Sequence, residues 1–394
     1  MPKSNLRQAL LMSLAVMLLL GIGLLPLGLY HPANAVTPTF QECDIFTGVG
    51  YGQINWYRPN ACPGVPSSVT FIKTLTVPFS DTYMTGMAFD LTGGCQTTGG
   101  ACMYATTFDA NTIAVFDNEG NYLGTCGTQG AADPTQNSNI ESASVAPNFG
   151  GGASIFFGQA DGDRHILQYP LPCTPSSTLT ASFAPCTSGS CTGTTRGTDW
   201  VDMTSNNCNI QYTSEGTGVL NFNVCTNTQG PAFAQGLPGP YAYAHRALSD
   251  GSVLVADSSA AVHVSSSGTI INSCDSSAAS GELFSMDVLP DQQSFAIANL
   301  GGDNSVNYIT VAHCDAGQST SDFSFIGVQP GQSYSAIGGV AIYGEFTQAV
   351  TTSTTGVGVP EFPVSSILVV AVGLLALTLM TRKMRLPTQL SKKV

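Results

Sequence analysis

IAVFDNEGNYLGTC at residues 113–126 and AVHVSSSGTIINSC at residues 261–274 align without a gap. Gly120 matches Gly268, and Cys126 matches Cys274. In each stretch a short apolar run, a glycine turn and a second short run follow one another, which is typical of a β-hairpin. The chain therefore contains the same hairpin unit twice, at positions 148 residues apart.

A second kind of short apolar run recurs ahead of such hairpins, and each copy is itself preceded by another run. The copies are CMYATTFD (102–109), SIFFGQAD (154–161), NIQYTSEG (209–216), SVLVADSS (252–259) and SFAIANLG (294–301). Their starts are 52, 55, 43 and 42 residues apart. Four short strands in each such period are typical of a propeller blade. Between residues 36 and 359 no apolar period of 3.6 residues is sustained, so we expect few helices.

These repeats predict an all-β fold, a six-bladed β-propeller. Five blades are expected at 84–127, 140–187, 197–236, 241–275 and 283–327. One further inner strand follows at 337–345, and the runs that begin at Ile45, Gln53 and Val69 supply three strands at the other end of the chain. We expect the sixth blade to combine the C-terminal strand with the three N-terminal strands. Such closure leaves fewer exposed sheet edges.

Composition and charge narrow the classes of function. Charged residues make up 9% of the 394 residues, against roughly 25% in ordinary soluble domains. Between residues 36 and 359 five basic residues stand against 24 acidic ones, a net charge of −19. Because phosphate binding needs a basic surface, we expect no nucleic-acid partner. We expect a monomer, and an acidic exterior that suits cations or salty surroundings.

Both ends of the chain predict export and anchoring. Lys3 and Arg7 precede an apolar run that ends at the cleavage-like Ala33-Asn34-Ala35, so residues 1–35 are predicted to be a signal peptide. An uncleaved anchor is the alternative. The propeller is expected at 36–348, a Thr/Gly/Pro linker at 349–363, a transmembrane helix at 364–381 and a basic cytoplasmic tail at 382–394. The predicted location is the extracellular face of the membrane.

Two resemblances add to this interpretation. The VPEFP stretch (359–363), the single span and the basic cluster resemble the C-terminal sorting signals of archaeal surface proteins. This resemblance implies a lipid anchor in place of the span, and a retained single span is the alternative. The blade pattern, with GTDWVDM (197–203) and QYTSEG (211–216), resembles NHL/YVTN-type and SMP-30/gluconolactonase-like six-bladed propellers over residues 43–346. That family contains lactonases, lyases and binding modules. Its metal set of one Glu, two Asn and one Asp is not present here in the family's spacing.

The twelve cysteines predict disulfides in an exported chain. No C-x-x-C motif occurs, which disfavours the alternative of metal binding. Neighbouring positions in the strand map predict four pairs. These are Cys43–Cys62, Cys208–Cys225, Cys95–Cys102 and Cys186–Cys191. The strand map assigns no partners to Cys126, Cys173, Cys274 and Cys314.

Candidate ligand-binding residues come from the loops and strand ends that a propeller places at the top of its channel. They are Glu141, Asp199, Trp200, Gln159, Asp161, Glu215, Tyr241, Asp257 and Asn299. Asp109, Asp163, Asp303 and Tyr243 occupy similar positions. Acidic residues are also ordinary turn formers, but Glu141 and Asp199 precede apolar strands. Carboxylates and amides at one mouth suit Ca²⁺ or another divalent cation, with Glu141 and Asp199 as candidate ligands.

Three functions fit these features. The first is a cell-surface propeller without catalytic activity that binds a small ligand, a glycan or a protein at its acidic top face. The second is a metal-dependent hydrolase or lyase resembling the SMP-30 and streptogramin-lyase proteins. The third is a structural envelope protein. The sequence contains no G-x-S-x-G, Walker or H-E-x-x-H motif, and no arrangement of Ser, His and Asp can be argued from it.

Overall fold

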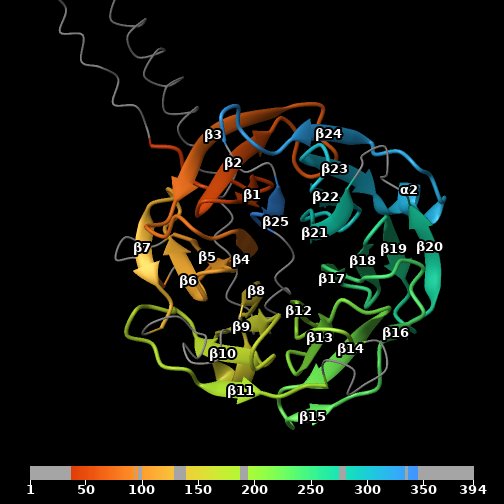
Figure 1. Ribbon diagram of the computed structural model, residues 1–394, viewed down its shortest axis with the longest axis horizontal. Helices are drawn as coiled ribbons and strands as arrows, with labels where there is room; N and C mark the ends of the chain where they lie inside the picture. Colours follow the sequence, from red (N-terminus) through yellow and green to blue (C-terminus); the bar gives the residue numbers. More distant parts are fainter. Residues whose placement is uncertain are drawn as a thin grey trace, which may run out of the picture. The chain divides into compact units, whose positions relative to one another are not determined.

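Six β-sheets surround a common centre in the computed structural model (Figure 1). The structure describes residues 37–92, 94–95, 100–127, 139–186, 194–274, 281–332 and 336–344. Within these ranges the helical elements are η1 (Phe149–Gly151) and α2 (Val311–Asp315). The prediction of an all-β, six-bladed propeller is confirmed.

Five blades consist of strands that are consecutive in the chain and antiparallel to their neighbours. Blade 1 contains β4 (Met84–Asp90), β5 (Cys102–Thr107), β6 (Thr112–Phe116) and β7 (Tyr122–Thr125), and blade 2 contains β8 (Ile140–Ala146), β9 (Ser154–Gln159), β10 (Ile166–Pro170) and β11 (Ala181–Phe183). Blade 3 contains β12 (Trp200–Met203), β13 (Asn209–Thr213), β14 (Gly218–Asn223), β15 (Thr228–Gln229) and β16 (Ala234–Gln235). Blade 4 contains β17 (His245–Ala247), β18 (Val253–Asp257), β19 (Ala260–Val264) and β20 (Ile270–Cys274), and blade 5 contains β21 (Glu282–Val288), β22 (Ser294–Leu300), β23 (Ser305–Thr310) and β24 (Phe323–Ile326).

Blade 6 joins the two ends of the propeller, as the sequence predicted. Its inner strand is β25 (Ile337–Ile342), which pairs antiparallel with β1 (Ile45–Val49). β2 (Gln53–Pro59) and β3 (Val69–Thr76) complete the sheet. In Figure 1 the blue β25 lies beside the red and orange strands of the N-terminal side.

Hydrogen bonds hold the inner strands of neighbouring blades together. In each, a side-chain oxygen of one blade accepts from a backbone N–H of the next blade. This arrangement gives partners to N–H groups that the inner edge of a sheet would otherwise leave unpaired. The acceptor–donor pairs are Ser142 Oγ with Val201 N (3.0 Å), Ser144 Oγ with Met203 N (3.0 Å), Asp202 Oδ2 with Ala247 N (2.8 Å), Ser285 Oγ with Val340 N (2.8 Å) and Asp287 Oδ2 with Ile342 N (2.6 Å). These bonds join the inner strands of blades 2 and 3, of blades 3 and 4, and of blades 5 and 6.

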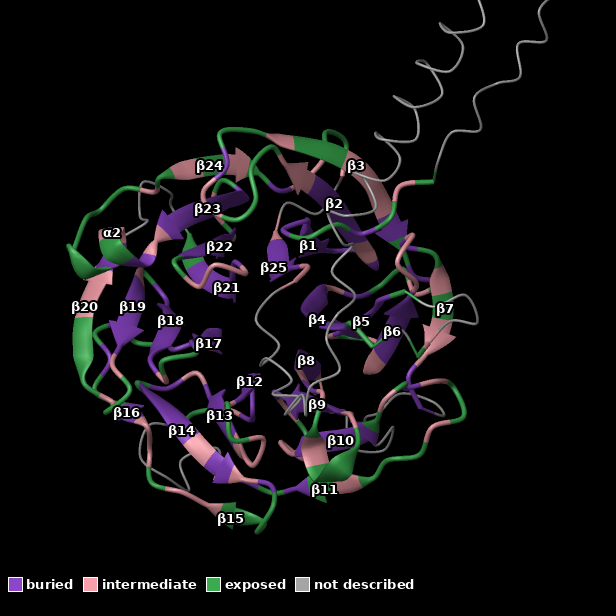
Figure 2. Cartoon of the chain, turned by 180° about the vertical axis from the view of Figure 1, so that it is seen from behind, coloured by how far each residue is buried: buried purple, intermediate pink, exposed green. Residues whose placement is uncertain are grey.

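Burial decreases from the inner strands of the propeller to its outer strands. Figure 2 shows the inner and middle strands buried and much of the outer strands exposed or half-buried. Apolar side chains of adjacent blades pack against each other, as where Phe156 of blade 2 and Phe222 of blade 3 share one cluster. The inner strands approach so closely that a side chain at Gly339 would overlap the Thr85 carbonyl oxygen. Blade-to-blade burial is thus the main apolar contribution to the fold.

Disulfides connect the strands and the blades. Three predicted pairs are confirmed, namely Cys43–Cys62, Cys95–Cys102 and Cys208–Cys225. The structure adds Cys126–Cys173, which joins blades 1 and 2, and Cys274–Cys314, which joins blade 4 to α2. Cys186 is also disulfide-bonded, and its predicted partner Cys191 lies outside the described residues. These bonds indicate an oxidising, extracellular location.

The predicted signal peptide (1–35), the linker, the membrane span and the tail (349–394) lie outside the described residues. Among the residues that are described, no helix has the length and apolar character that a membrane crossing requires.

Candidate functional site

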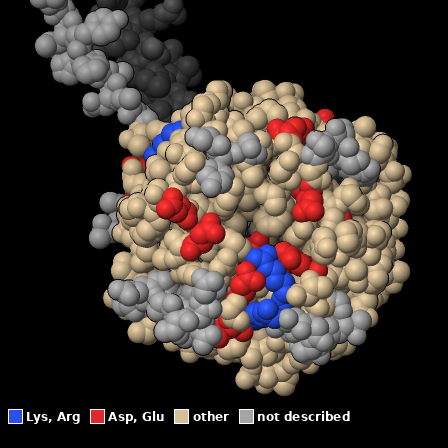
Figure 3. Space-filling view, in the orientation of Figure 1, with Lys and Arg blue, Asp and Glu red and all other residues tan. Residues whose placement is uncertain are grey.

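The predicted ligand-binding residues lie on the face that carries the loop between the second and third strand of each blade. We call it the top face. The inner strands begin at this face, because each blade is antiparallel throughout. Figure 3 shows basic side chains bordered by acidic ones near the centre of the ring.

Arg196 lies in the segment that leads into β12 and contacts several carboxylates. Its Nε and Nη2 donate to the two carboxylate oxygens of Asp161 at 3.1 and 2.8 Å. Its Nη1 donates to Glu215 and lies 3.7 Å from Glu141 Oε2. We call these four residues and Asp199 the mouth cluster. The guanidinium thus contacts three carboxyl groups from blades 2 and 3, and it also interacts electrostatically with Asp199.

The local sequence explains why Arg196 reaches this position. The backbone N–H of Gly197 donates to Ala160 O at 2.8 Å, and that of Thr198 donates to Gln159 O at 2.9 Å. The segment before β12 therefore lies directly against the end of β9. A side chain at Gly197 would overlap the carbonyl oxygens of Gln159 and Ala160. Glycine at this position allows the approach that sets Arg196 above the Asp161 turn.

Glu141 and Asp199 are the buried acids of the cluster, each 2% exposed. Glu141 Oε2 and both carboxyl oxygens of Asp199 have no hydrogen-bond partner in the described part of the chain. Burial raises the pKa of Glu141 to about 8, although Arg196 opposes the shift. Burial also raises the pKa of Asp199, and the charge on Glu141 adds to that shift. Near pH 7 Glu141 is therefore mostly protonated.

A cavity of about 290 Å³, the mouth cavity, opens beside these acids. Its lining comes from the tops of several blades and consists of Tyr83, Thr85, Phe108, Glu141, Arg196, Phe284, Leu300 and Gly338. The Arg196 guanidinium lies 5.4 Å from the centre of the Phe108 ring. An apolar cavity with a few converging polar groups is the usual form of a small-ligand site.

The structure places two of the predicted aromatic residues outside the lining of this cavity. Trp200 is 1% exposed and packs edge-on against Phe284, with ring centres 6.3 Å apart. Tyr241 is 42% exposed and lies 6.1 Å from the ring of Tyr243, whose hydroxyl donates to Glu282 at 2.7 Å. Neither Trp200 nor Tyr241 is among the residues that line the mouth cavity.

The remaining predicted residues make contacts within their own turns or with nearby backbone. Gln159 Oε1 accepts from the backbone N–H of His165 at 3.1 Å. Asn299 Nδ2 donates to Asp303 at 3.4 Å, and its Oδ1 is buried. Asp257 accepts from a backbone amide, and burial raises its pKa to about 6. The structure therefore brings together Glu141, Asp161, Asp199 and Glu215 but not these three.

The predicted metal role of Glu141 and Asp199 stays a prediction. Across the described ranges, no group of three or more His, Cys, Asp or Glu side chains is placed to hold a metal ion. Hard cations such as Ca²⁺ need six to eight oxygen ligands. Glu141 and Asp199 also have the Arg196 cation close by. We therefore derive no catalytic step through a metal at the mouth.

The sequence reasoning missed the apolar wall of the cavity and the role of Arg196. Phe108, Phe284 and Leu300 belong to short apolar runs in which core and cavity positions look the same. Arg196 carried a usable signal, because it is one of five basic residues in 36–359 and stands three positions before the predicted Asp199.

A second arrangement of polar groups lies near the outside of blade 4. His263 Nδ1 is 2.6 Å from Asp315 Oδ1, and its Nε2 is 3.1 Å from Ser252 Oγ. This is the order of groups in a serine-hydrolase triad. However, Ser252 is 3% exposed, and its hydroxyl donates to Asp250 at 2.6 Å. The hydroxyl is thus buried and engaged, and the network is a structural link between blade 4 and α2.

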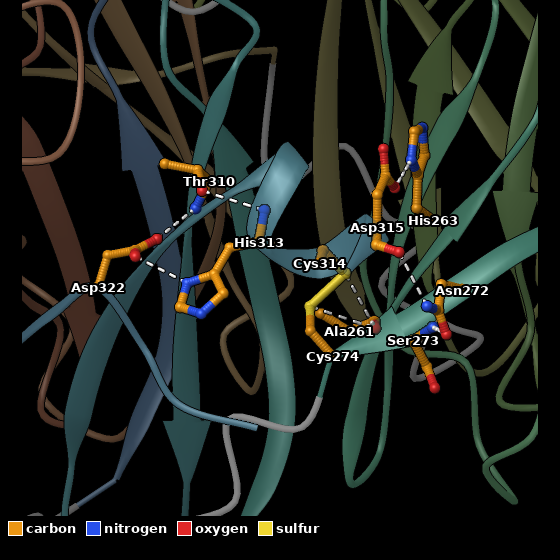
Figure 4. The surroundings of a disulfide bond; sticks show 10 residues. All are labelled: Ala261, His263, Asn272, Ser273, Cys274, Thr310, His313, Cys314, Asp315 and Asp322. Carbon is orange, nitrogen blue, oxygen red and sulfur yellow. Dashed lines mark hydrogen bonds and ion pairs between the residues drawn. A yellow bond between two sulfur atoms is a disulfide. The ribbon is translucent and has the colours of Figure 1, made fainter. Parts of the chain in front are cut away.

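Figure 4 shows how α2 is fixed by this link and by the disulfide Cys274–Cys314. Asn272 Nδ2 also donates to the backbone oxygen at the end of α2, at 2.9 Å. Beyond the disulfide, His313 Nδ1 lies 2.7 Å from Asp322 Oδ1. A disulfide typically stabilises a fold by about 2–4 kcal/mol. Together with the polar contacts, it holds α2 against blades 4 and 5.

No protein-family model matches the chain, and no curated protein sequence matches it. The resemblance to NHL/YVTN and SMP-30-like propellers and the resemblance to archaeal sorting signals therefore gain no support from these comparisons. The six-bladed architecture rests on the structure itself.

Proposed function

We propose that the protein is a cell-surface recognition propeller that binds a small ligand in the mouth cavity. The observation that carries this proposal is the pairing of an apolar cavity with Glu141, a lining residue whose Oε2 is buried without a hydrogen-bond partner among the described residues. Buried polar atoms in folded proteins nearly always have a partner. A ligand group in the cavity would supply one.

The predicted signal peptide, membrane span and disulfides support an extracellular setting for this activity. Retention at the membrane, by the span or by a lipid, belongs to the same proposal. The metal-dependent hydrolase predicted as an alternative is not favoured, because the described residues do not include a metal-binding trio. Among the described residues no contact specifically favours a structural envelope protein.

The proposal is tested by blocking the cavity. Small neutral, cationic and anionic molecules are screened by ligand-observed NMR against the wild-type chain and the Leu300→Trp variant. Leu300 lines the cavity, so the larger side chain should fill it and weaken binding by about tenfold or more. Leu123→Trp is the matched control, because Leu123 is 44% exposed on the outer strand β7.

We expect at least one molecule to bind the wild type and the Leu123→Trp variant equally and the Leu300→Trp variant more weakly. A screen in which nothing binds, or in which every binder also binds Leu300→Trp unchanged, would refute a ligand site in the mouth cavity. Circular dichroism spectra and melting curves establish that both variants are folded.

A further inference from the structure

The mouth cluster has more carboxyl groups than basic groups to offer a ligand. Asp161 takes two donor groups of Arg196, and Glu215 takes another. In the described part of the chain Arg196 is the basic residue that lines the mouth cavity, so Glu141 and Asp199 have no basic side chain to themselves there. A carboxylate ligand would have to displace Asp161 or Glu215 from the guanidinium. A cation beside Glu141 would displace a proton and no side chain.

The walls of the mouth cavity suit a cation that carries apolar groups. Tyr83, Phe108 and Phe284 supply three aromatic side chains. The face of an aromatic ring attracts cations, and alkylated ammonium groups are bound in this way by aromatic cages. The Arg196 guanidinium over Phe108 is an example of this contact at the same wall. A hydrated metal ion would gain little from such walls.

We propose that the ligand of the mouth cavity is a compact organic cation, an alkylated ammonium compound whose charge faces Glu141 and whose alkyl groups contact Tyr83, Phe108 and Phe284. This inference rests on the proposed function and names its ligand class. Asp199 is a second buried carboxyl group of the same mouth cluster.

The volume of the cavity limits the size of this cation. The cavity of about 290 Å³ is near the lower end of the roughly 300–1,000 Å³ that is usual for small-ligand sites. Tetramethylammonium and choline are within this limit. Long peptides and sugar chains are not, although part of one could enter.

The test is isothermal titration calorimetry with four probes on the wild-type chain. The probes are tetramethylammonium, choline, 3,3-dimethylbutan-1-ol (the neutral carbon analogue of choline) and pivalate, a compact anion. We expect choline to bind at least about tenfold more tightly than its neutral analogue, which is the scale of a desolvated cation–aromatic contact. Pivalate should not bind measurably.

Variants identify the groups responsible. Glu141→Gln and Phe108→Leu should each weaken choline binding by about tenfold. Glu42→Gln is the control, because it removes an exposed carboxylate that precedes β1, at the face opposite the mouth. It should leave choline binding unchanged. Glu141→Gln keeps the size of the side chain, and a melting curve checks that the variant is folded.

The outcomes separate this inference from the proposed function. If the neutral analogue binds as tightly as choline, or pivalate binds in preference, the mouth cavity is a ligand site and the cation inference is wrong. The cavity is also a ligand site, and the cation inference is also wrong, if none of the four probes binds but the Leu300→Trp screen yields another ligand. If no molecule of any class binds at the cavity, both proposals fail.

Discussion

Replacing Arg196 with Gln should lower the free energy of unfolding by about 2–4 kcal/mol at pH 7. The guanidinium is the shared cation of Asp161, Glu215 and Glu141. Breaking a buried ion pair typically costs about 3–5 kcal/mol, and the partial exposure of Asp161 and Glu215, 38% and 24% for their side chains, reduces this figure. Urea denaturation of the two proteins measures the difference.

Arg164→Gln is the control for this experiment, because it removes the same charge from the turn beside Asp161. Its effect should stay within about 0.5 kcal/mol, as is usual for surface substitutions. Equal stability of Arg196→Gln and the wild type would mean that the mouth cluster does not depend on the guanidinium, contrary to the geometry described above.

The second large effect is a loss of stability as the pH rises from about 6.5 to 8. Because burial raises the pKa of Glu141 from 4.5 to about 8, the folded chain holds a proton that the unfolded chain has already released. The free energy of unfolding then falls with pH, by about 1.4 kcal/mol per pH unit for one group. Asp199, whose pKa is also raised, acts in the same direction.

The protonation of His245 sets the lower pH limit of the range in which stability falls with pH. Burial, together with the neighbouring Arg246, lowers its pKa to about 3, so below about pH 6.5 the unfolded chain binds a proton that the folded chain does not. That difference makes stability rise with pH and opposes the effect of Glu141. Above about pH 6.5 both states hold a neutral His245, and the effect of Glu141 is no longer offset.

Denaturation curves at half-unit steps from pH 6.5 to 8.5 measure this effect. We expect a decrease of about 2 kcal/mol in the wild type by pH 8 and a much smaller one in Glu141→Gln, which cannot ionise. Glu42→Gln should follow the wild type. If Glu141→Gln shows the same decrease as the wild type, Glu141 is not the group that holds the proton.

The sequence was sufficient for the architecture because a propeller repeats one unit. The run at 337–345 could be recognised as an inner strand without partners behind it, and β25 does pair with β1. Cys43–Cys62 and Cys208–Cys225 were predictable, since each pair joins neighbouring strands of one blade. Cys126–Cys173 was not, because it depends on how two blades pack together.

The sequence predicted the acidic residues of the candidate site but not the aromatic residues that line its cavity. Glu141 and Asp199 stood out because each precedes an apolar strand without forming a turn, and the structure places them in one cluster. Phe108 and Phe284 look like ordinary core residues in sequence, and only the packing of neighbouring blades makes them the wall of a cavity. The Asp315–His263–Ser252 link spans two blades, so spacing along the chain gave no indication of it.

The central claim is that a cation binds against Glu141 in the mouth cavity. The most direct measurement is the number of protons released when choline binds at pH 7, obtained by calorimetry in two buffers with different heats of ionisation. Since the pKa of Glu141 is about 8 in the free protein, binding that requires its carboxylate should release close to one proton, and affinity should increase up to about pH 8. Choline binding without proton release, equally tight at pH 6 and pH 8.5, would contradict the account.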